Sequence, residues 1–454
     1  MQDSSKQDPL ALSNVKRFIA FRLLFNARFY YPIFTILFLD FGLTLEQFAI
    51  LNAVWAITIV LLEVPSGALA DTIGRRNLVV LSAFIMVAEM LLIAFAPIGN
   101  SQVVFYLFLA NRILSGAAEA AASGADEALA FDSLKERGLE EMWGKVLERQ
   151  MRFQSIAFVI AMSTGAILYD VDKLNAIIQF FGVEWELTKS TAMRLPILGT
   201  LGLGILAVIT TLGMRETSGT EPVRHSWATV KKSFTNTLEA GNWILKTPLA
   251  FVIICAGMLF DHVVRMVLTL NSEYYRQIDL PEFSYGFIGA GLALLGTIMP
   301  KLGEKMVDGR SKAFNFIALA LTISVGLWVM SQFIPFWGAL PMILVYGGIF
   351  LNGFFVSHYL NQITDSRHRA TVLSFKGLSF NLAYGVIGYI YAASIARLRE
   401  SDQIASLPDE EVSKTLFQTV FAWGPTYFSI LAVAVFFFAM IRLKSSGIKR
   451  ETAQ

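Results

Sequence analysis

The sequence predicts an all-α membrane protein of twelve transmembrane helices, arranged as two pseudo-symmetric six-helix halves. Of its 454 residues, 55% are hydrophobic and only 16% are charged, so the chain is far more apolar than a soluble domain of its size. A bilayer is crossed by about 20 mostly apolar residues. Segments of that kind occur at 18–40, 46–70, 77–98, 102–131, 143–169, 192–214, 248–275, 284–306, 312–333, 336–360, 368–397 and 414–442.

The positions of the basic residues orient these helices, because Lys and Arg accumulate in cytoplasmic loops. With both termini in the cytoplasm, most of the 37 Lys and Arg residues lie in the termini and the cytoplasmic connections. The outer side then holds only Lys173, Lys189, Arg194, Arg276, Arg397, Arg399 and Lys414. We therefore expect a multi-pass protein of the cytoplasmic (inner) membrane with both termini in the cytoplasm.

The longest cytoplasmic connection divides the chain into residues 1–214, a linker at 215–247, and residues 248–454. Within the linker, Trp227, Val230, Phe234 and Leu238 follow helical spacing, which predicts an amphipathic helix on the inner leaflet. The segment 303–312 (GEKMVDGRSK) is a degraded echo of the segment 67–76 (GALADTIGRR), at the equivalent place in the second half. The echo favours two related halves.

Composition also excludes several classes of function. The net charge of +2 and the absence of a basic stripe argue against a nucleic-acid partner. The chain has one cysteine, Cys255, and no cluster of metal-ligand spacing, so we expect no metal site and no cofactor. No G-x-x-x-x-G-K-[ST] loop for nucleotide phosphates occurs, and no nucleophile–base constellation is recognisable. We expect that the protein is not an enzyme.

The segment 67–76 joins the second and third spans through a few polar residues. Gly67 and Gly74 remove side chains where the backbone is expected to turn or pack closely, while Asp71, Arg75 and Arg76 place opposite charges at the membrane rim. The pattern G-x-L-A-D-x-x-G-R-R resembles the signature loop between helices two and three of the major facilitator superfamily of transporters. The resemblance implies that family's fold and secondary transport by alternating access.

Further segments resemble bacterial members that carry the loop variant Glu63-Val-Pro-Ser-Gly67, namely 124–134 at the inner end of the fourth span and 367–374 at the start of the eleventh. The resemblance implies that Asp71 caps the helix that begins near Arg369, and that Arg75 pairs with Asp126 or Asp132. The cytoplasmic gate would then comprise Glu63, Gly67, Asp71, Gly74, Arg75, Arg76, Asp132 and Arg369. In the fifth span, the stretch 158–168 has one glycine, Gly165, and no proline, in place of the G-x-x-x-G-P-x-x-G-G run of many proton-antiporting exporters, which argues against a drug antiporter.

Ionisable residues inside spans are costly and therefore mark candidate sites. In the fourth span, Arg112, Ser115, Glu119, Ala122 and Asp126 follow 3,4,3,4 spacing on one face, and small residues between them allow another helix to approach. The run from Arg112 to Gly116 resembles the R-x-x-x-G pattern of proton-coupled members. We predict proton coupling through Glu119, Asp126 and Asp261. The alternative is a permanent Arg112–Glu119 ion pair that only clamps helices.

Two other spans contribute candidates for solute binding. Arg28 precedes Phe29, Tyr30 and Tyr31, which suits an anionic solute group, and the alternative is an arginine buried against Glu119 or Glu89. In the seventh span, Asp261 and Arg265 lie four residues apart beside His262. Either they form a local ion pair or they face the solute. The predicted substrate-binding set is Arg28, Arg112, Glu119, Asp261, His262 and Arg265.

These features together predict a secondary active transporter of a polar or zwitterionic small organic solute, coupled to protons. Metabolites, antibiotics and iron chelators all fit that solute class. An uncoupled facilitator and a drug-type exporter are alternatives within the same class of protein, and a transporter-like receptor is an alternative of a different class. The expected partners are the solute, protons and the lipid bilayer, and we expect a monomer.

Overall fold

The computed structural model describes residues 8–99, 101–182, 184–217, 235, 239, 241–364 and 369–445. In these residues the secondary structure is helical, which confirms the predicted all-α class, and eleven helices are long and apolar enough to cross a membrane. Of the linker, residues 215–217, 235, 239 and 241–247 are described, whereas its expected amphipathic helix at 227–238 lies outside the described residues except for residue 235.

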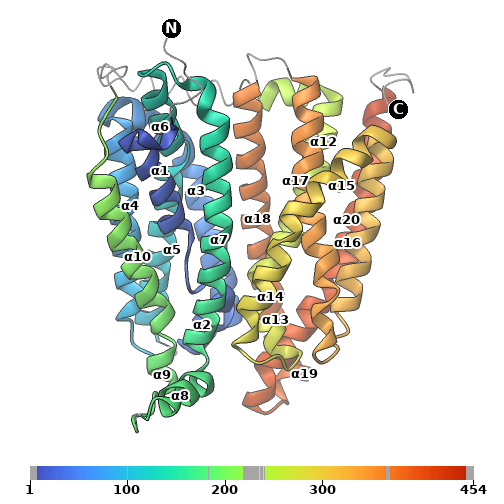
Figure 1. Cartoon of the computed structure of the whole chain (residues 1–454). Coiled ribbons are helices and arrows are strands. Elements are labelled where there is room, and N and C mark those ends of the chain that lie inside the picture. The colour runs from blue at the N-terminus through green and yellow to red at the C-terminus, as the bar shows by residue number, and fades with distance from the viewer. Residues whose placement is uncertain are drawn as a thin grey trace. The chain divides into compact units, whose positions relative to one another are not determined.

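The chain forms two compact units (Figure 1). Unit 1 comprises Met1–Leu43, Ile57–Ser233 and Glu282–Phe287, and unit 2 comprises Thr44–Ala56, Phe234–Pro281 and Ile288–Gln454. Each unit thus includes one short segment, 282–287 or 44–56, from the part of the sequence that otherwise builds the other unit.

The N-terminal part of the chain, up to the linker, contributes ten α-helices and three short 3₁₀ helices to the described residues. They are η2 (Pro9–Ala11), α1 (Ser13–Asn26), η3 (Tyr31–Ile33), α2 (Phe34–Asp40), α3 (Leu45–Ile73), α4 (Arg75–Ala94), α5 (Gln102–Ala122), α6 (Ala125–Lys135), η4 (Glu140–Met142), α7 (Trp143–Tyr169), α8 (Val171–Phe180), α9 (Lys189–Ala192) and α10 (Leu195–Leu212).

The part of the chain after the linker contributes nine more α-helices to the described residues. They are α12 (Pro248–Thr269), α13 (Asn271–Gln277), α14 (Ser284–Ala293), α15 (Leu295–Gly309), α16 (Lys312–Met330), α17 (Met342–Ile363), α18 (Arg369–Arg399), α19 (Asp402–Ala405) and α20 (Asp409–Ser445), with the 3₁₀ helix η5 (Trp337–Ala339) before α17.

The first predicted span, 18–40, is not one helix. Helix α1 ends at Asn26, and the chain continues without helical structure through residues 27–30 before η3 and α2 begin. Pro32, in the first turn of η3, lacks the N–H that a continuous helix needs there. At the break, the Phe29 N–H donates to the Thr200 hydroxyl at 3.0 Å, so this backbone group is satisfied by a side chain of α10.

The fourth predicted span, 102–131, is also divided. Helix α5 ends at Ala122, Gly124 adopts a left-handed conformation with φ of +75°, and α6 begins at Ala125. Such a conformation favours glycine, since a side chain is strained there. Asp126 therefore lies in the first turn of a second helix. The prediction that Arg112 and Asp126 share one face of a single helix is wrong, because the first helix ends at Ala122.

The loop predicted between the second and third spans is much shorter than expected. Helix α3 continues through Pro65 as far as Ile73, and Gly74 alone makes the turn, with φ of +91°. A Cβ at Gly74 would lie 2.5 Å from Oε2 of Glu216, whereas a Cβ at Gly67 would meet nothing within 4 Å. The expectation of a turn or close packing is confirmed at Gly74 and is wrong at Gly67.

Two further predicted spans are divided in the same way. The seventh, predicted as 248–275, becomes α12 and α13 with a junction at Leu270. The eighth, predicted as 284–306, becomes α14 and α15 with a junction at Leu294.

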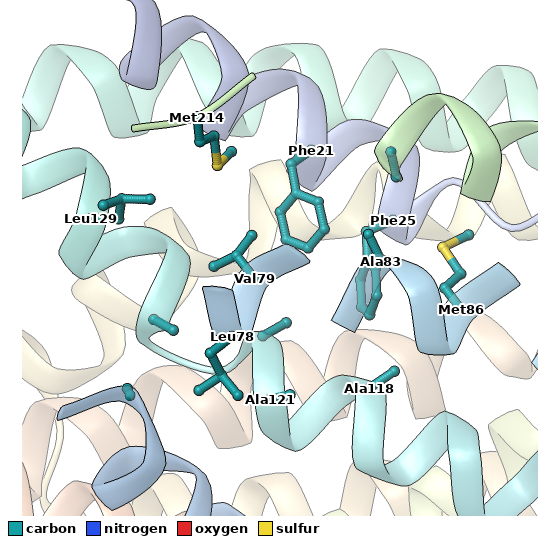
Figure 2. Close-up of a cluster of buried hydrophobic side chains, with 14 residues drawn as sticks. Phe21, Phe25, Leu78, Val79, Ala83, Met86, Ala118, Ala121, Leu129 and Met214 are labelled. Atoms are coloured by element: carbon teal, nitrogen blue, oxygen red, sulfur yellow. The ribbon is translucent and has the colours of Figure 1, made fainter. Parts of the chain in front are cut away.

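The core of unit 1 lies between α1, α4, α5, α6 and α10. Figure 2 shows Phe21 and Phe25 of α1 beside Val79 and Met86 of α4. From α5, Ala118 lies in this cluster with Ala121 and Ala122, and all of them are buried. Their small side chains let neighbouring helices pack closely. The prediction that small residues beside Glu119 let another helix approach is thus confirmed for Ala118 and Ala121.

Candidate functional site

A buried ion pair occupies the break in the first span. The Arg28 guanidinium donates to Glu89 Oε1 of α4 through Nη1, which also donates to the Tyr30 hydroxyl at 3.0 Å. The Arg28 and Glu89 side chains are 1% and 0% exposed. A buried charge is costly unless an opposite charge lies next to it, so this ion pair holds the break against α4.

Glu119 of α5 is the second carboxylate near this guanidinium. Its Oε1 lies 3.8 Å from Arg28 Nη2, too far for a hydrogen bond, and its side chain is 32% exposed. Nη2 is buried and has no hydrogen-bond partner among the described residues. A buried nitrogen without an acceptor is costly. The geometry therefore leaves one buried donor of Arg28 without an acceptor, next to a carboxylate that is partly exposed.

Arg112 is buried on the same helix as Glu119. Its guanidinium carbon lies 5.3 Å from the centre of the Phe34 ring in α2, which is a cation–π distance. Arg28 is paired with a carboxylate, which is one of its two predicted roles. It contacts Glu89 and lies 3.8 Å from Glu119, so the partner shown for Glu119 is Arg28.

Asp126 belongs to a different cluster. At the start of α6 it is buried, and its Oδ2 lies 2.5 Å from Nε of Arg22 in α1. Arg22 also contacts Glu127 at 2.8 Å. The predicted alternative in which Arg75 pairs with Asp126 is therefore not the arrangement found.

In unit 2 the predicted residues of the seventh span lie together on α12. Asp261 Oδ2 is 2.6 Å from Arg265 Nη2, which confirms the local ion pair. Arg265 also donates to Asn381 Oδ1 of α18 at 2.7 Å and lies over the Tyr384 ring at 5.2 Å. The Tyr384 hydroxyl is 2.7 Å from that of Thr269. The pair is thus part of a polar network between α12 and α18.

His262 has a partner on each ring nitrogen. Nδ1 lies 2.6 Å from the Met258 carbonyl, and Nε2 lies 3.2 Å from the Tyr427 hydroxyl of α20. A carbonyl only accepts, so Nδ1 carries the proton and Nε2 can accept from the tyrosine. This is the pattern of a neutral, satisfied histidine.

Three of the predicted gate residues, Arg75, Arg76 and Asp132, have described contacts at the start of α4. Arg75 pairs with Asp132 of α6, which is the other of the two partners that the sequence left open. Arg76 donates to the carbonyls of Met214 and Leu212 at 2.8 and 3.0 Å, at the end of α10. In return, the Arg76 N–H donates to Oε2 of Glu216 at 3.0 Å. Each helix end therefore receives the charge that suits its dipole.

The other gate residues are less fully placed. Glu63 lies in the last part of α3, and its Oε2 is buried without a hydrogen-bond partner in the described part of the chain. The backbone of Asp71 is helical and Arg369 begins α18, but both side chains lie outside what the structure describes. The expected cap of Asp71 on that helix stays a prediction.

Several residues of these clusters were missed as site residues. Glu89 was named only as a possible partner of Arg28, although an acidic residue in the middle of the third span is itself a signal. Asn381, Tyr384 and Tyr427 gave no comparable signal, because a polar residue in a span does not show which helix it meets. Among the described residues, no group of three His, Cys, Asp or Glu side chains is placed to hold a metal ion.

Comparisons with known proteins agree with this architecture. A family model described as Major Facilitator Superfamily matches residues 18–388. The nucleoside transporter NupG is similar in structure, with a TM-score of 0.66 and 13% identity over 96% of this chain and 100% of that one. No curated protein sequence matches the chain.

Two more solved structures share the fold. A bacterial homologue of the human lysosomal transporter Spinster, in an inward-facing and unoccupied conformation, has a TM-score of 0.66 and 14% identity over 98% of both chains. A D-xylose–proton symporter has a TM-score of 0.62 and 12% identity over 92% of this chain and 96% of that one. At such identities the likeness concerns the fold alone.

Proposed function

Because the chain belongs to the Major Facilitator Superfamily, we propose that it moves a zwitterionic or otherwise polar small organic solute across the cytoplasmic membrane by alternating access, driven by protons. Membership of a transporter family, and eleven helices in the described residues that are long and apolar enough to cross a membrane, make it a multi-pass membrane transporter of small molecules. The finer parts of the proposal are the charge of the solute, the proton coupling, the inner membrane and the cytoplasmic termini.

The observation that carries the proposal is the unsatisfied donor of Arg28 beside Glu119. Nη2 is buried without a hydrogen bond and lies 3.8 Å from Glu119 Oε1. A carboxylate or phosphate oxygen of a solute would satisfy this donor, and a guanidinium is well suited to such groups. An anionic group in this place would, however, meet the negative charge of Glu119.

Protonation of Glu119 removes that conflict. A neutral Glu119 no longer repels an anion, and it can donate a hydrogen bond to it. Arg28 keeps its charge partner in this state, because Glu89 remains bound to the same guanidinium. Proton and solute would then bind together, which is the linkage that a symporter requires. The sign follows directly: the anionic solute binds more tightly as the pH falls through the pKa of Glu119.

We also propose that the polar network of unit 2 takes part in solute binding. Asp261 would bind a cationic group, with Arg265 and His262 held in place through their contacts with Asn381 and Tyr427. We assign Arg28, Arg112, Glu119, Asp261, His262 and Arg265 to solute binding, and Glu119, Asp126 and Asp261 to the proton path. Gly74, Arg75, Arg76 and Asp132 would stabilise the closed cytoplasmic gate, with Glu63, Gly67, Asp71 and Arg369 as its other members.

A ligand screen tests the solute class directly. Purified protein is heated with amino acids, dipeptides, nucleosides, pentoses and organic acids, each at two pH values, since a bound solute raises the unfolding temperature. We expect stabilisation by solutes that carry a carboxylate or phosphate, stronger at the lower pH, followed by their pH-driven uptake into proteoliposomes. Stabilisation by neutral pentoses or nucleosides alone, independent of pH, would contradict the proposed anionic group of the solute and its linkage to the proton.

A further inference from the structure

Unit 2 contains an apolar cavity that the transport proposal does not use. It lies between α12, α18 and α20, with one side chain from α16, and has a volume of about 140 Å³. Its lining includes Val263 and Val267 of α12, Ile390 of α18 and Trp423 of α20. Engineered cavities of about 150 Å³ with similar walls stay free of water and bind small apolar molecules such as benzene. Water is therefore not the natural occupant.

The surroundings of the cavity indicate what would fill it. Ile390 and Trp423 line it and are 41% and 48% exposed, so the cavity opens between α18 and α20. Ile430 and Phe437 are exposed on the same face of α20 as Trp423, at intervals of about two turns. Only 6% of the most apolar window of this membrane helix is buried. The face around the opening is thus one that meets hydrocarbon chains.

One polar group of the lining is left without a partner. The Tyr391 hydroxyl is buried and has no hydrogen-bond partner among the described residues, and the residue as a whole is 8% exposed. Tyr391 lies roughly 10 Å from the midpoint of the 31-residue helix α18, at about 1.5 Å per residue. That depth is about 5 Å inside the edge of a hydrocarbon core about 30 Å thick, so this part of the cavity is level with acyl chains.

We propose that this cavity, lined by α12, α18 and α20, binds an acyl chain of a bilayer phospholipid. The chain enters between Ile390 and Trp423. The site lies behind the helix that carries Asp261 and Arg265, and Tyr427 lines the cavity while contacting His262. Binding at this site does not depend on the identity of the transported solute.

Photolabelling in nanodiscs tests the proposal. A phospholipid with a diazirine on one acyl chain is incorporated, and the labelled peptides are mapped by mass spectrometry. We expect label on the cavity-lining parts of α12, α18 and α20 in the unmodified protein. In Gly424→Leu this label should be lost, because a Cβ at Gly424 has nothing within 4 Å and the leucine would occupy the cavity.

Matched variants keep this result interpretable. Gly202→Leu also adds a leucine to an exposed glycine with nothing within 4 Å, but on α10 and away from the cavity, and it should leave the label unchanged. Gly424 precedes Pro425, where a side chain can disfavour helix, so Ser394→Leu fills the same cavity from α18 as a second variant. Label that persists in both folded filling variants, or that lies only on outward residues such as Ile430, would overturn the proposal.

Competition tests whether the occupant is a bilayer phospholipid. An excess of unlabelled phospholipid should compete, and competition by free fatty acid in its place would contradict the assignment to a bilayer phospholipid.

Discussion

Gly165 of α7 lies directly against the backbone of Phe29, so that a Cβ at position 165 would overlap the Phe29 carbonyl group. On the other side, a Cβ at Gly199 of α10 would lie 2.8 Å from the Phe29 ring. Together with the hydrogen bond from Phe29 to Thr200, these two glycines form a niche for the break that positions Arg28. Gly165, the one glycine of the stretch 158–168, thus has a structural explanation within this chain.

The first prediction follows from this niche. Gly165→Ala should destabilise the protein by about 1–3 kcal/mol or more, since backbone must move to accommodate the methyl group. Gly202→Ala is the control, because a Cβ there meets nothing within 4 Å. Thermal unfolding of the purified variants in detergent measures the difference, and equal unfolding temperatures for the two variants would contradict the role of the niche.

The two glycines should differ in how they can be rescued. At Gly199 the obstacle is the Phe29 side chain, so Phe29→Ala should restore much of the stability that Gly199→Ala loses. At Gly165 the obstacle is the Phe29 backbone, and the same second change should not help. Rescue of both variants alike would show that the break itself is not held in the described position.

The second prediction concerns the buried pair of Arg28 and Glu89. Glu89→Gln leaves the guanidinium buried without its closest anion, which typically costs about 3–5 kcal/mol. Glu119→Gln should cost much less, because Glu119 is partly exposed and makes no hydrogen bond to Arg28. Unfolding midpoints for the two variants give the order, and a larger loss for Glu119→Gln would refute the assignment of Glu89 as the structural partner.

The third prediction concerns the pair at the cytoplasmic end of α4. The Arg75 and Asp132 side chains are 25% and 30% exposed, so their coupling in a double-mutant cycle should be modest, about 0.2–1 kcal/mol. Asp126→Ala should be additive with Arg75→Ala, because Asp126 pairs with Arg22. Coupling of Arg75 to Asp126 and not to Asp132 would contradict the assignment of Asp132 as the partner of Arg75.

The fourth prediction separates the two glycines of the loop motif. Gly74→Ala should destabilise by about 1–3 kcal/mol, since φ of +91° strains any side chain and the Cβ would contact Glu216. Gly67→Ala should be neutral or slightly stabilising, because Gly67 is helical and its Cβ meets nothing within 4 Å. Denaturation curves of both variants decide the matter. Equal destabilisation would mean that Gly67 needs a close approach that the structure does not show.

The sequence predicts the helical class and the positions of most spans well, because long apolar runs have few other solutions in a membrane. It does not predict where spans break. The break at residues 27–30 depends on Gly165, Gly199 and Thr200, which are distant in sequence, and the break at Gly124 depends on one left-handed residue within an alanine-rich run that otherwise favours helix.

The candidate site follows the same division. Charges inside spans identify Arg28, Glu119 and Asp261 from the sequence alone, because burying a charge is costly wherever it occurs. The partner of each charge cannot be predicted in this way, because ion pairing depends on which helices pack against each other. Periodicity places Asp126 beside Glu119, whereas the turn at Gly124 directs it to Arg22.

The central claim is that Glu119 carries the proton that drives transport. The decisive measurement compares pH-driven uptake with counterflow for Glu119→Gln, in the same proteoliposomes and with the solute found by the ligand screen. Because Arg28 keeps Glu89, the variant should fold and exchange solute normally. It should lose gradient-driven accumulation and the pH dependence of solute binding. Accumulation driven by pH at the level of the unmodified protein would contradict the account and leave Asp261 or Asp126 as the carboxylate to test.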